Sequence, residues 1–299
     1  MISVCIPIYN SYAYPLARRL YNQAAKQGLD VEIVCIDNNS SAFYANQNKG
    51  LVEVSTYVRL KEKIGTARLK NLFLKYAKGE YLLLLESDMQ PDENYLKNYE
   101  RLLAKNPQVV VGGELAPEGG KKNAGEYRLH TMYSSQREWL AAKERTRRPY
   151  YCFSSNNCLI NREVFSKVTF STIGDKQGNE DYLFAYRLMQ ARVPVLHVDN
   201  GVRRERLYEN AEFLHNLVEK TQNQVAIYDS MWEDQTFCTM VPVLSRYTRL
   251  RRLGLIGLYY RCFKLVKNIS ESHFVNGTGV SIRQLKFYCL GVFLEELKK

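Results

Sequence analysis

The stretch Tyr81–Pro91, with the sequence YLLLLESDMQP, decides the fold of this chain. It begins with an apolar run, 81–85, bounded by a glycine and a proline, which predicts a short strand buried on both faces. The run ends abruptly in Glu86, Ser87 and Asp88, and carboxylates at the end of a buried strand need water or partners. Because strand side chains repeat with a period of two, we expect Glu86 and Asp88 to point to the same side.

This position in a sheet is where ligands bind. In open α/β sheets, ligands lie beyond the carboxyl ends of the strands. Two oxygen ligands on one side suit a divalent cation, Mn²⁺ or Mg²⁺, and the diphosphate whose charge the cation neutralises. The alternative is a strand that ends in a solvated acidic loop, so the neighbouring segments must decide between the two.

The composition indicates a globular, basic protein. The chain has 299 residues, of which 45% are hydrophobic and 12% aromatic, so it can bury a large core. Its formal net charge of +11 favours anionic partners: nucleic acid, anionic lipid or phosphorylated substrates. The seven cysteines have no CxxC or Cys/His spacing, which favours reduced thiols in a cytoplasmic protein over a disulfide framework or a zinc site. We expect no signal peptide before the first strand and no segment that spans a bilayer.

The N-terminal segment repeats the pattern of a buried strand with a polar end. Strands are predicted over 2–9 and 31–36, with a helix over 17–25 between them, and the second strand runs into Asp37, Asn38 and Asn39. A βαβ unit of this kind brings both polar ends to one edge of the sheet. A turn capped by Asp37 is the simpler alternative.

A strand over 54–60 and a helix over 64–77 precede the central strand. Gly65 and Arg68 lie in the first turn of this helix. An arginine there opposes the helix dipole, so a bound phosphate would explain it, whereas a solvated surface arginine is the alternative.

The α/β pattern continues to about residue 210. We expect strands over 108–111 and 193–199, a helix from Arg162, an irregular polar segment over 151–161, and a helix over 182–190. Glu180 and Asp181 open the last helix, where capping explains one acidic residue but does not require both. The basic stretch 117–148 predicts a mobile loop and a helix over the site. This stretch contains Arg145, Arg147 and Arg148. We expect these arginines to contact either an anionic substrate or only solvent.

The remaining residues predict a separate helical region, so we expect an α/β domain over 1–210 and a basic helical region over 211–299. No acidic residue occurs between Arg246 and Ser270, where basic residues alternate with apolar ones. This pattern suits the surface of an anionic membrane. Alternatively, these helices form an interface in a homo-oligomer or pack on the α/β domain. A last amphipathic helix is predicted over 281–297.

Six stretches, in this order, resemble motifs of the bacterial family 2 glycosyltransferases, which have the GT-A fold. They lie within residues 1–210 and read ISVCIPIYN, VCIDNNS, IGTARLKN, KGEYLLLLESDMQP, FSSNNCLINREVF and GNEDYLFAYRL. The resemblance implies a Rossmann-like nucleotide-diphospho-sugar transferase domain with a mixed central sheet, extended by C-terminal helices. It implies an inverting transferase that moves a sugar from a nucleotide-diphosphate sugar, UDP-linked, to a hydroxyl of a glycan acceptor in cell-surface polysaccharide synthesis.

The same resemblance implies roles for particular residues. Asp88 would bind the divalent cation, and Asp181, next to Glu180, would be the general base that takes the proton of the acceptor. The remaining implied residues would hold the nucleotide-sugar: Pro7, Tyr9, Asp37, Asn39, Gly65, Arg68, Glu86 and Ser87.

The chain departs from the family pattern in two places. Glu86 stands where the family motif has an aspartate, and Arg204 stands where many relatives have a metal-binding histidine. An arginine cannot ligate a cation but can pair with a diphosphate, so we hypothesise that Arg204, or Arg203, takes over part of the charge role of the metal. Glu205 is an alternative ligand, and His197 is expected to pack in the core.

Other functions are disfavoured by the sequence. A nucleotidyltransferase or a Rossmann dehydrogenase would need a glycine-rich loop after the first strand, which PIYNSYAYP lacks. A catalytically weakened scaffold subunit of a polysaccharide assembly complex is the main alternative, but retention of Asp88 and Asp181 argues against it. Nucleic-acid binding is not expected, because the basic residues concentrate in the tail without a base-reading motif. A lipid-linked acceptor would place the enzyme at the inner face of the cell membrane, as a cytoplasmic, peripheral protein.

Overall fold

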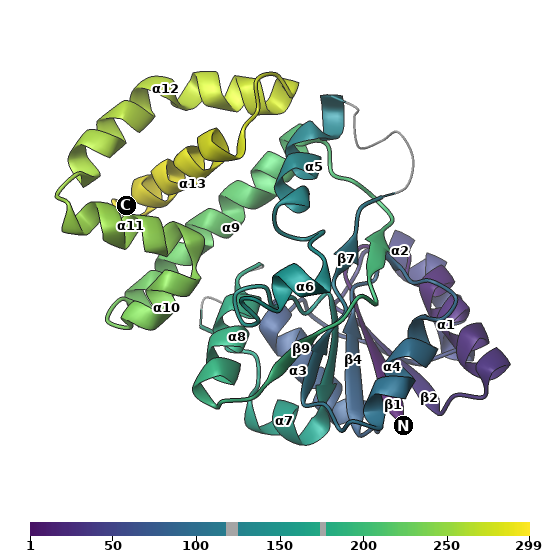
Figure 1. Cartoon of the computed structure of the whole chain (residues 1–299). Coiled ribbons are helices and arrows are strands. Elements are labelled where there is room, and N and C mark those ends of the chain that lie inside the picture. Colours follow the sequence, from purple (N-terminus) through teal and green to yellow (C-terminus); the bar gives the residue numbers. More distant parts are fainter. Residues whose placement is uncertain (118–124, 174–177) are drawn as a thin grey trace. The chain divides into compact units, whose positions relative to one another are not determined.

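The computed structural model describes residues 1–117, 125–173 and 178–299 (Figure 1). These residues form two compact units. The first unit comprises residues 1–116, 138–172 and 183–206, and the second comprises 117–137, 173–182 and 207–299.

The first unit is built on a mixed sheet. Its strand order is β3-β2-β1-β4-β8-β6-β9, and every neighbouring pair is parallel except those that involve β8. The strands are β1 (Ile2–Ile8), β2 (Val31–Asp37), β3 (Thr56–Arg59), β4 (Tyr81–Leu85), β6 (Val109–Val111), β8 (Asn157–Asn161) and β9 (Val195–His197). The predicted strands over 2–9, 31–36, 81–85 and 108–111 are therefore confirmed to within two residues, because buried parallel strands appear in the sequence as continuous apolar runs.

Helices cover both faces of this sheet (Figure 1). Helices α1 (Tyr14–Gln27) and α4 (Tyr95–Leu103) lie on one face, and α3 (Thr66–Tyr76), α7 (Arg162–Lys167) and α8 (Glu180–Gln190) lie on the other. The second face has an aromatic core in which Phe170 stacks on Phe184 with their ring centroids 4.1 Å apart. Shorter elements connect these parts: α2 (Ala42–Gln47), η1 (Lys49–Glu53) and α6 (Ala142–Arg145).

Strand β8 corrects one prediction. The sequence predicts an irregular segment over 151–161, but Asn157–Asn161 form the antiparallel strand between β4 and β6. Its first residue, Asn157, is buried because its amide is fully used: Oδ1 accepts from the hydroxyls of Tyr95 and Tyr99 at 2.8 and 2.7 Å. Its Nδ2 donates to two backbone carbonyls. A polar strand can lie in the core when each polar group has a partner.

A second, smaller sheet lies at the end of the first. It has the order β5-β10-β7 and consists of β5 (Met89–Gln90), β7 (Glu114–Leu115) and β10 (Val202–Arg204). Arg204 pairs with Met89 in the antiparallel ladder, and Val202 pairs with Glu114 in the parallel one. This register brings three segments that are distant in sequence next to Asp88.

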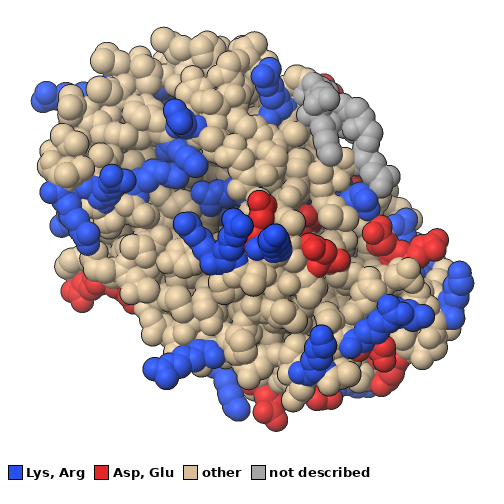
Figure 2. Space-filling view, in the orientation of Figure 1, with Lys and Arg blue, Asp and Glu red and all other residues tan. Residues whose placement is uncertain are grey.

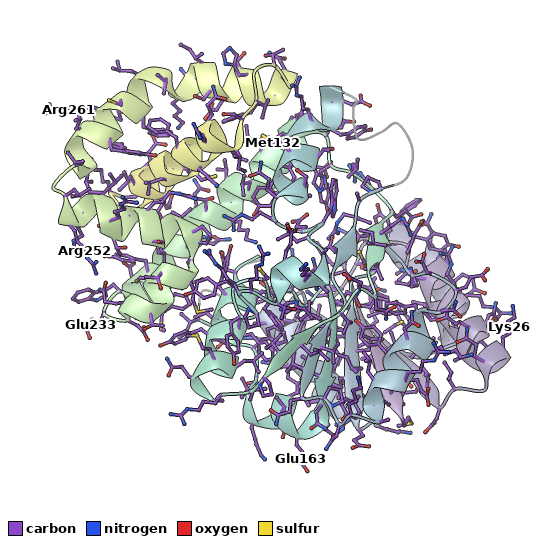
Figure 3. The ribbon with its side chains drawn as sticks, viewed as in Figure 1. Lys26, Met132, Glu163, Glu233, Arg252 and Arg261 are labelled. Atoms are coloured by element: carbon purple, nitrogen blue, oxygen red, sulfur yellow. The ribbon has the colours of Figure 1, made fainter. Side chains whose placement is uncertain are left out.

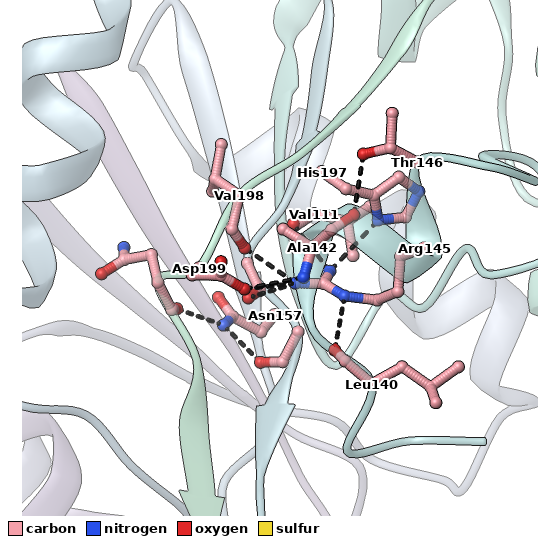
Figure 4. A network of polar contacts seen from close by, with 12 residues as sticks. Val111, Leu140, Ala142, Arg145, Thr146, Asn157, His197, Val198 and Asp199 are labelled. Atoms are coloured by element: carbon pink, nitrogen blue, oxygen red, sulfur yellow. Dashed lines mark hydrogen bonds and ion pairs between the residues drawn. The ribbon is translucent and has the colours of Figure 1, made fainter. Parts of the chain in front are cut away.

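Arg145 is a structural residue, which corrects both alternatives offered by the sequence. It is 3% exposed, and its guanidinium donates to four backbone carbonyls at 2.8–3.0 Å (Figure 4). Its Nη1 also lies 3.1 Å from Nδ1 of His197, whose Nε2 lies 2.9 Å from the carbonyl oxygen of Pro149. Arg145 therefore joins α6 to the ends of β6 and β9, and the expectation that His197 packs in the core is confirmed.

The second unit is helical. Its long helix α9 (Asn210–Met231) packs against α5 (Arg128–Ser135), α12 (Ile256–Asn276) and α13 (Ile282–Glu296), and α13 also packs against α11 (Pro242–Arg252). A capping box between Ser281 and Gln284 starts α13, close to the predicted start. The unit also contains η3 (Gly125–Tyr127) and α10 (Gln235–Met240).

Three sequence predictions concern the chain as a whole. Residues 118–124 of the predicted mobile loop lie outside the described residues, and the rest of 117–148 contains η3, α5 and α6. All seven cysteines lie in described segments and are free thiols. Within the described segments, no helix has the length and apolar character needed to cross a bilayer.

Candidate active site

Three loops that follow β1, β2 and β4 are tied together by hydrogen bonds. The backbone N–H of Asn10 donates to Oγ of Ser40, and the N–H of Ser41 donates to Oδ1 of Asn10, both at 2.9 Å. The hydroxyls of Ser11 and Ser87 lie 2.7 Å apart. The sequence therefore predicted correctly that these polar strand ends come together, because parallel strands end at the same edge.

Asp37 lies fully buried at the end of β2. Its Oδ1 accepts from the N–H of Ser40 at 2.7 Å, and its Oδ2 accepts from the hydroxyl of Tyr57 at 2.8 Å. Asp37 thus shapes the loop after β2, as the turn-capping alternative requires. Its implied contact with the nucleotide-sugar remains a prediction, as do those of Asn39, which is exposed with φ of 60°, and Pro7, which lies within β1.

The buried amide of Asn38 fixes the loop before α3. It donates to the carbonyl oxygen of Ile64 and accepts from the N–H of the same residue, both at 2.8 Å. Gly65 is consequently the N-cap of α3, and Arg68 lies exposed in the first turn. This places Arg68 where the sequence predicted it, whereas Asn38 was not singled out.

Tyr9 is exposed at the end of β1. Its side chain is 45% accessible, and Nζ of Lys63 lies 3.9 Å from its ring centroid. The pair offers an aromatic face and a positive charge at the edge of the sheet. The sequence did not single out Lys63.

Glu86 and Asp88 have different partners. Strand β4 ends at Leu85, and the N–H of Met89 donates to the carbonyl oxygen of Glu86 in a turn, so the period of two does not extend to these residues. Oε1 of Glu86 lies 3.7 Å from Nζ of Lys70, which is 2% exposed and also donates to Ser155 at 2.6 Å. Lys70 was missed, although it lies on the buried face of α3, where a lysine needs a partner.

Asp88 belongs to a cluster with Arg204 and Glu114. Nη1 of Arg204 lies 2.5 Å from Oδ2 of Asp88, and Nη2 lies 3.5 Å from Oε2 of Glu114. Oε1 of Glu114 accepts from Asn156 at 2.7 Å. Burial raises the pKa of Glu114 to about 7, although the charge of Arg204 lowers it. The sequence predicted a role for Arg204 but not for Glu114, whose only signal is an acidic residue that follows β6 after two glycines.

Glu180 and Asp181 form the first turn of α8 and are assigned to the second unit. The N–H of Gly178 donates to Oε2 of Glu180 at 3.0 Å, which ties Glu180 to the segment just before the helix. Asp181 is half-buried beside it. The catalytic roles of Glu180 and Asp181 remain predictions.

Comparison with known families matches residues 3–169 to the family model described as glycosyl transferase family 2. The chain belongs to this family. The family 2 chain is accordingly a glycosyltransferase, as the motifs predicted.

Individual relatives agree with this assignment. The family 2 enzyme is 26% identical over 210 residues to the glycosyltransferase GlyG of Streptococcus pneumoniae serotype 4, covering 64% of this chain and 67% of that protein. The mannosyltransferase PcManGT from Pyrobaculum calidifontis, solved with GDP-Man and Mn²⁺, has a similar structure with a TM-score of 0.56 at 14% identity, over 99% of this chain and 85% of that one. S. aureus TarS 1–349, solved with UDP-GlcNAc, gives a TM-score of 0.52 at 15% identity, over 99% and 89%. Likenesses at this identity confirm the GT-A fold.

The donor set of the family 2 enzyme limits how a metal could bind. Among residues 1–117, 125–173 and 178–299, no group of three or more His, Cys, Asp and Glu side chains could hold a metal ion. Mg²⁺ needs only one or two protein carboxylates when substrate phosphates complete its shell. Asp88 can supply one, although it shares Oδ2 with Arg204. The residues therefore fit a cation held jointly with a diphosphate and do not form a site made by protein alone. Glu205 is exposed, and its role as a ligand stays a prediction.

Proposed function

We propose that this glycosyltransferase is inverting and transfers a sugar from a nucleotide-diphosphate sugar, UDP-linked, to a hydroxyl of a glycan in cell-surface polysaccharide synthesis. The observation that carries the proposal is that hydrogen bonds join the loops after β1, β2 and β4. The last of these loops contains Asp88. Proteins of similar fold have been solved with GDP-Man and with UDP-GlcNAc, which supports a donor of this class.

The leaving group is a diphosphate, and its negative charge must be stabilised. Arg204 presents a planar guanidinium that suits phosphate oxygens. When bound at Asp88, a divalent cation would supply further positive charge at the diphosphate. We expect both charges to act on the same group, because Arg204 and Asp88 are already in contact.

The acceptor must lose a proton as it reacts. Its hydroxyl oxygen attacks the anomeric carbon, and the bond from that carbon to the diphosphate oxygen breaks, with the electron pair leaving on the diphosphate. The carboxylate of Asp181 takes the hydroxyl proton. A single displacement of this kind inverts the anomeric centre and needs no covalent enzyme intermediate.

The basic helices of the second unit support the proposed attachment to an anionic membrane surface. Basic side chains are spread over these helices on the face seen in Figure 2. Helix α12 exposes Leu258, Leu265 and Ile269 at 62%, 80% and 58%. Together with Arg261, which is labelled on α12 in Figure 3, they follow one another at spacings of three and four residues, which places all four on one side of the helix. Exposed apolar and basic residues on one face match the interior and the headgroups of an anionic leaflet. A lipid-linked glycan at the cytoplasmic face would then be the acceptor.

Vesicle co-sedimentation tests this attachment. Vesicles that contain phosphatidylglycerol should retain the protein, vesicles of phosphatidylcholine alone should retain less, and Leu265→Ser with Ile269→Ser should weaken binding to both. Equal binding to the two vesicle types, or none, would contradict a role in binding anionic membranes.

Calorimetric titration tests the transferase itself. Nucleotide diphosphates and their sugars are titrated with and without Mn²⁺ into the wild type, Asp88→Ala and Asp181→Asn. We expect the uridine compounds to bind, Asp88→Ala to lose any enhancement by metal, and Asp181→Asn to bind donor normally while product formation falls by about a hundredfold or more. Absence of nucleotide binding in every arm would favour the scaffold alternative.

A further inference from the structure

The second unit contains a basic pocket. It is enclosed by α5, the first turn of α8, α9, α11 and α13, and contains about 470 Å³ of empty space including its open mouth. Four of its lining residues are basic: Arg137, Lys220, Arg246 and Lys286.

The charges in this pocket repel one another. Burial lowers the pKa of Arg246, and the charge of Arg137 lowers it further. Burial also lowers the pKa of Lys286, as do the nearby charges of Arg246, Arg137 and Arg283. In the described part of the chain, no ion pair with a carboxylate compensates Arg246 or Lys286. Cations held together in this way are stabilised when an anion binds between them.

A buried hydrogen-bond acceptor lines the same pocket. Gln224 is 4% exposed, and in the described segments its Oε1 has no hydrogen-bond partner. The orientation of its amide follows from its neighbours. Asn179 donates its Nδ2 to the carbonyl oxygen of Lys220, so its Oδ1 faces Gln224 and accepts from Nε2 at 3.0 Å. Oε1 is thereby left to accept from a ligand, and a hydroxyl is a suitable donor.

The pocket adjoins the residue proposed as the general base. Tyr182 lines it and directly follows Asp181 in the first turn of α8. Nζ of Lys220 lies 5.5 Å from the ring centroid of Tyr182. Burial lowers the pKa of Lys220, but Tyr182, Tyr133, Glu180 and Asp181 raise it by more, so this lysine stays charged. A ligand in the pocket would therefore lie near the carboxylate that accepts a proton.

We propose that this pocket holds the acceptor through a phosphate group, with Arg246 and Lys286 pairing with the phosphate and Gln224 accepting from a sugar or polyol hydroxyl. The acceptor class is thus a phosphorylated glycan or polyol. Guanidinium and ammonium groups together suit a phosphate that carries up to two charges. This inference rests on the proposed function, because it assigns the acceptor of the reaction in which Asp181 is the base.

The test uses glucose 1-phosphate as the probe and glucose as the neutral control, each titrated into the full chain. The wild type should bind the phosphate and not glucose. Lys286→Ala and Arg246→Ala should each weaken phosphate binding by about tenfold or more, the loss of one charge-assisted contact. Arg283→Ala removes the same charge from the exposed side of α13 and should change binding by less than about twofold.

Thermal unfolding separates binding from a structural role. Without ligand, Lys286→Ala should not melt below the wild type, because the substitution relieves repulsion. With glucose 1-phosphate, the wild type and Arg283→Ala should gain in Tm, and Lys286→Ala should not. Equal responses to glucose and its phosphate, equal losses in Arg283→Ala and Lys286→Ala, or no binding of the phosphate would overturn the pocket proposal.

Two further experiments complete the test. One shows which of the two proposals has failed, and the other shows whether the phosphate belongs to a lipid or to a soluble glycan. Asp88→Ala should bind glucose 1-phosphate as the wild type does, because Asp88 does not line the pocket. If the wild type binds the nucleotide-sugar but not glucose 1-phosphate, only the pocket proposal is overturned. If it binds glucose 1-phosphate but no nucleotide, the proposed function is overturned. Competition for the pocket by phosphatidylglycerol vesicles, abolished in Lys286→Ala, would assign a lipid-borne phosphate. Binding unaffected by vesicles would assign the phosphate of a soluble glycan.

Discussion

Arg204 and Asp88 form an ion pair in which Nη1 of the arginine lies 2.5 Å from Oδ2 of the carboxylate. The two residues are far apart in sequence and meet because β10 pairs with β5, directly after Asp88. The proposed metal ligand is therefore in contact with a permanent positive charge. We therefore expect a diphosphate held at Asp88 through a cation to meet the guanidinium of Arg204 as well.

Replacing Arg204 should reduce transfer. Arg204→Ala removes a charge from the proposed diphosphate site, so we expect kcat/KM for the donor to fall by about tenfold to a hundredfold, with partial recovery in Arg204→Lys. Arg203→Ala serves as the comparison, because Arg203 pairs with the more exposed Asp92 at 3.0 Å. Steady-state kinetics over a range of Mn²⁺ concentrations provide the measurement. Unchanged donor affinity and turnover in Arg204→Ala would remove this residue from the mechanism.

Glu114 should make stability depend on pH near neutrality. Its pKa of about 7 in the fold exceeds the ordinary value of 4.5, so its contribution is fully present below about pH 4.5 and is lost as the pH rises through 7. Glu114→Gln cannot ionise. From about pH 5 to pH 8, the free energy of unfolding of wild type should fall by about 2 kcal/mol more than that of Glu114→Gln. Urea denaturation at the two pH values checks this, and parallel curves for both proteins would contradict it.

Lys70 should stabilise Glu86 and the first unit. Lys70→Met removes a buried ammonium that contacts Glu86 and Ser155, so we expect a loss of about 1–3 kcal/mol in the free energy of unfolding. Glu86→Gln alone should cost less, because Glu86 is 28% exposed. A double-mutant cycle with both changes measures the coupling, and additive effects would show that the pair contributes nothing.

Arg145 should be important for stability and not for binding of an anionic substrate. Arg145→Ala removes the hydrogen bonds of a buried guanidinium to four backbone carbonyls, so we expect a loss of about 3 kcal/mol or more. Arg147→Ala, at an exposed position, should lie within about 0.5 kcal/mol of the wild type. Chemical denaturation compares the two, and similar stabilities would disprove a structural role.

Protonation of His197 should lower the stability of the fold in mild acid. Burial lowers its pKa to about 4, against an ordinary value of 6.5, and the charge of Arg145 also disfavours protonation. A neutral His197 therefore contributes stability that is present above about pH 6.5 and is lost as the pH falls toward 4, by up to about 3 kcal/mol. His197→Gln should unfold with a weaker dependence on pH across this window. An NMR titration that gives a pKa near 6.5 in the folded protein would refute the argument.

The sequence alone determined the parallel strands of the main sheet, the polar residues at their ends and the family. Buried parallel strands such as β1 and β4 appear as unbroken apolar runs, and the residues after them are the ones a ligand can reach. These features are local, so they can be recognised without knowing what packs against what. Asp88 was found on this basis, whereas Arg204 was found through the resemblance to the family motifs.

Only the tertiary structure decided which side chains meet. Strand β8 has an apolar centre of only three residues between two asparagines, so its own sequence did not mark it as a strand. The hydroxyls of Tyr95 and Tyr99, on helix α4, donate to Asn157 and allow it to lie in the core. Lys70 and Glu114 acquire their roles from partners on other elements, and Arg145 acquires its role from backbone carbonyls. A buried charge is stable only with such partners, and their distance in sequence hides them from any local pattern.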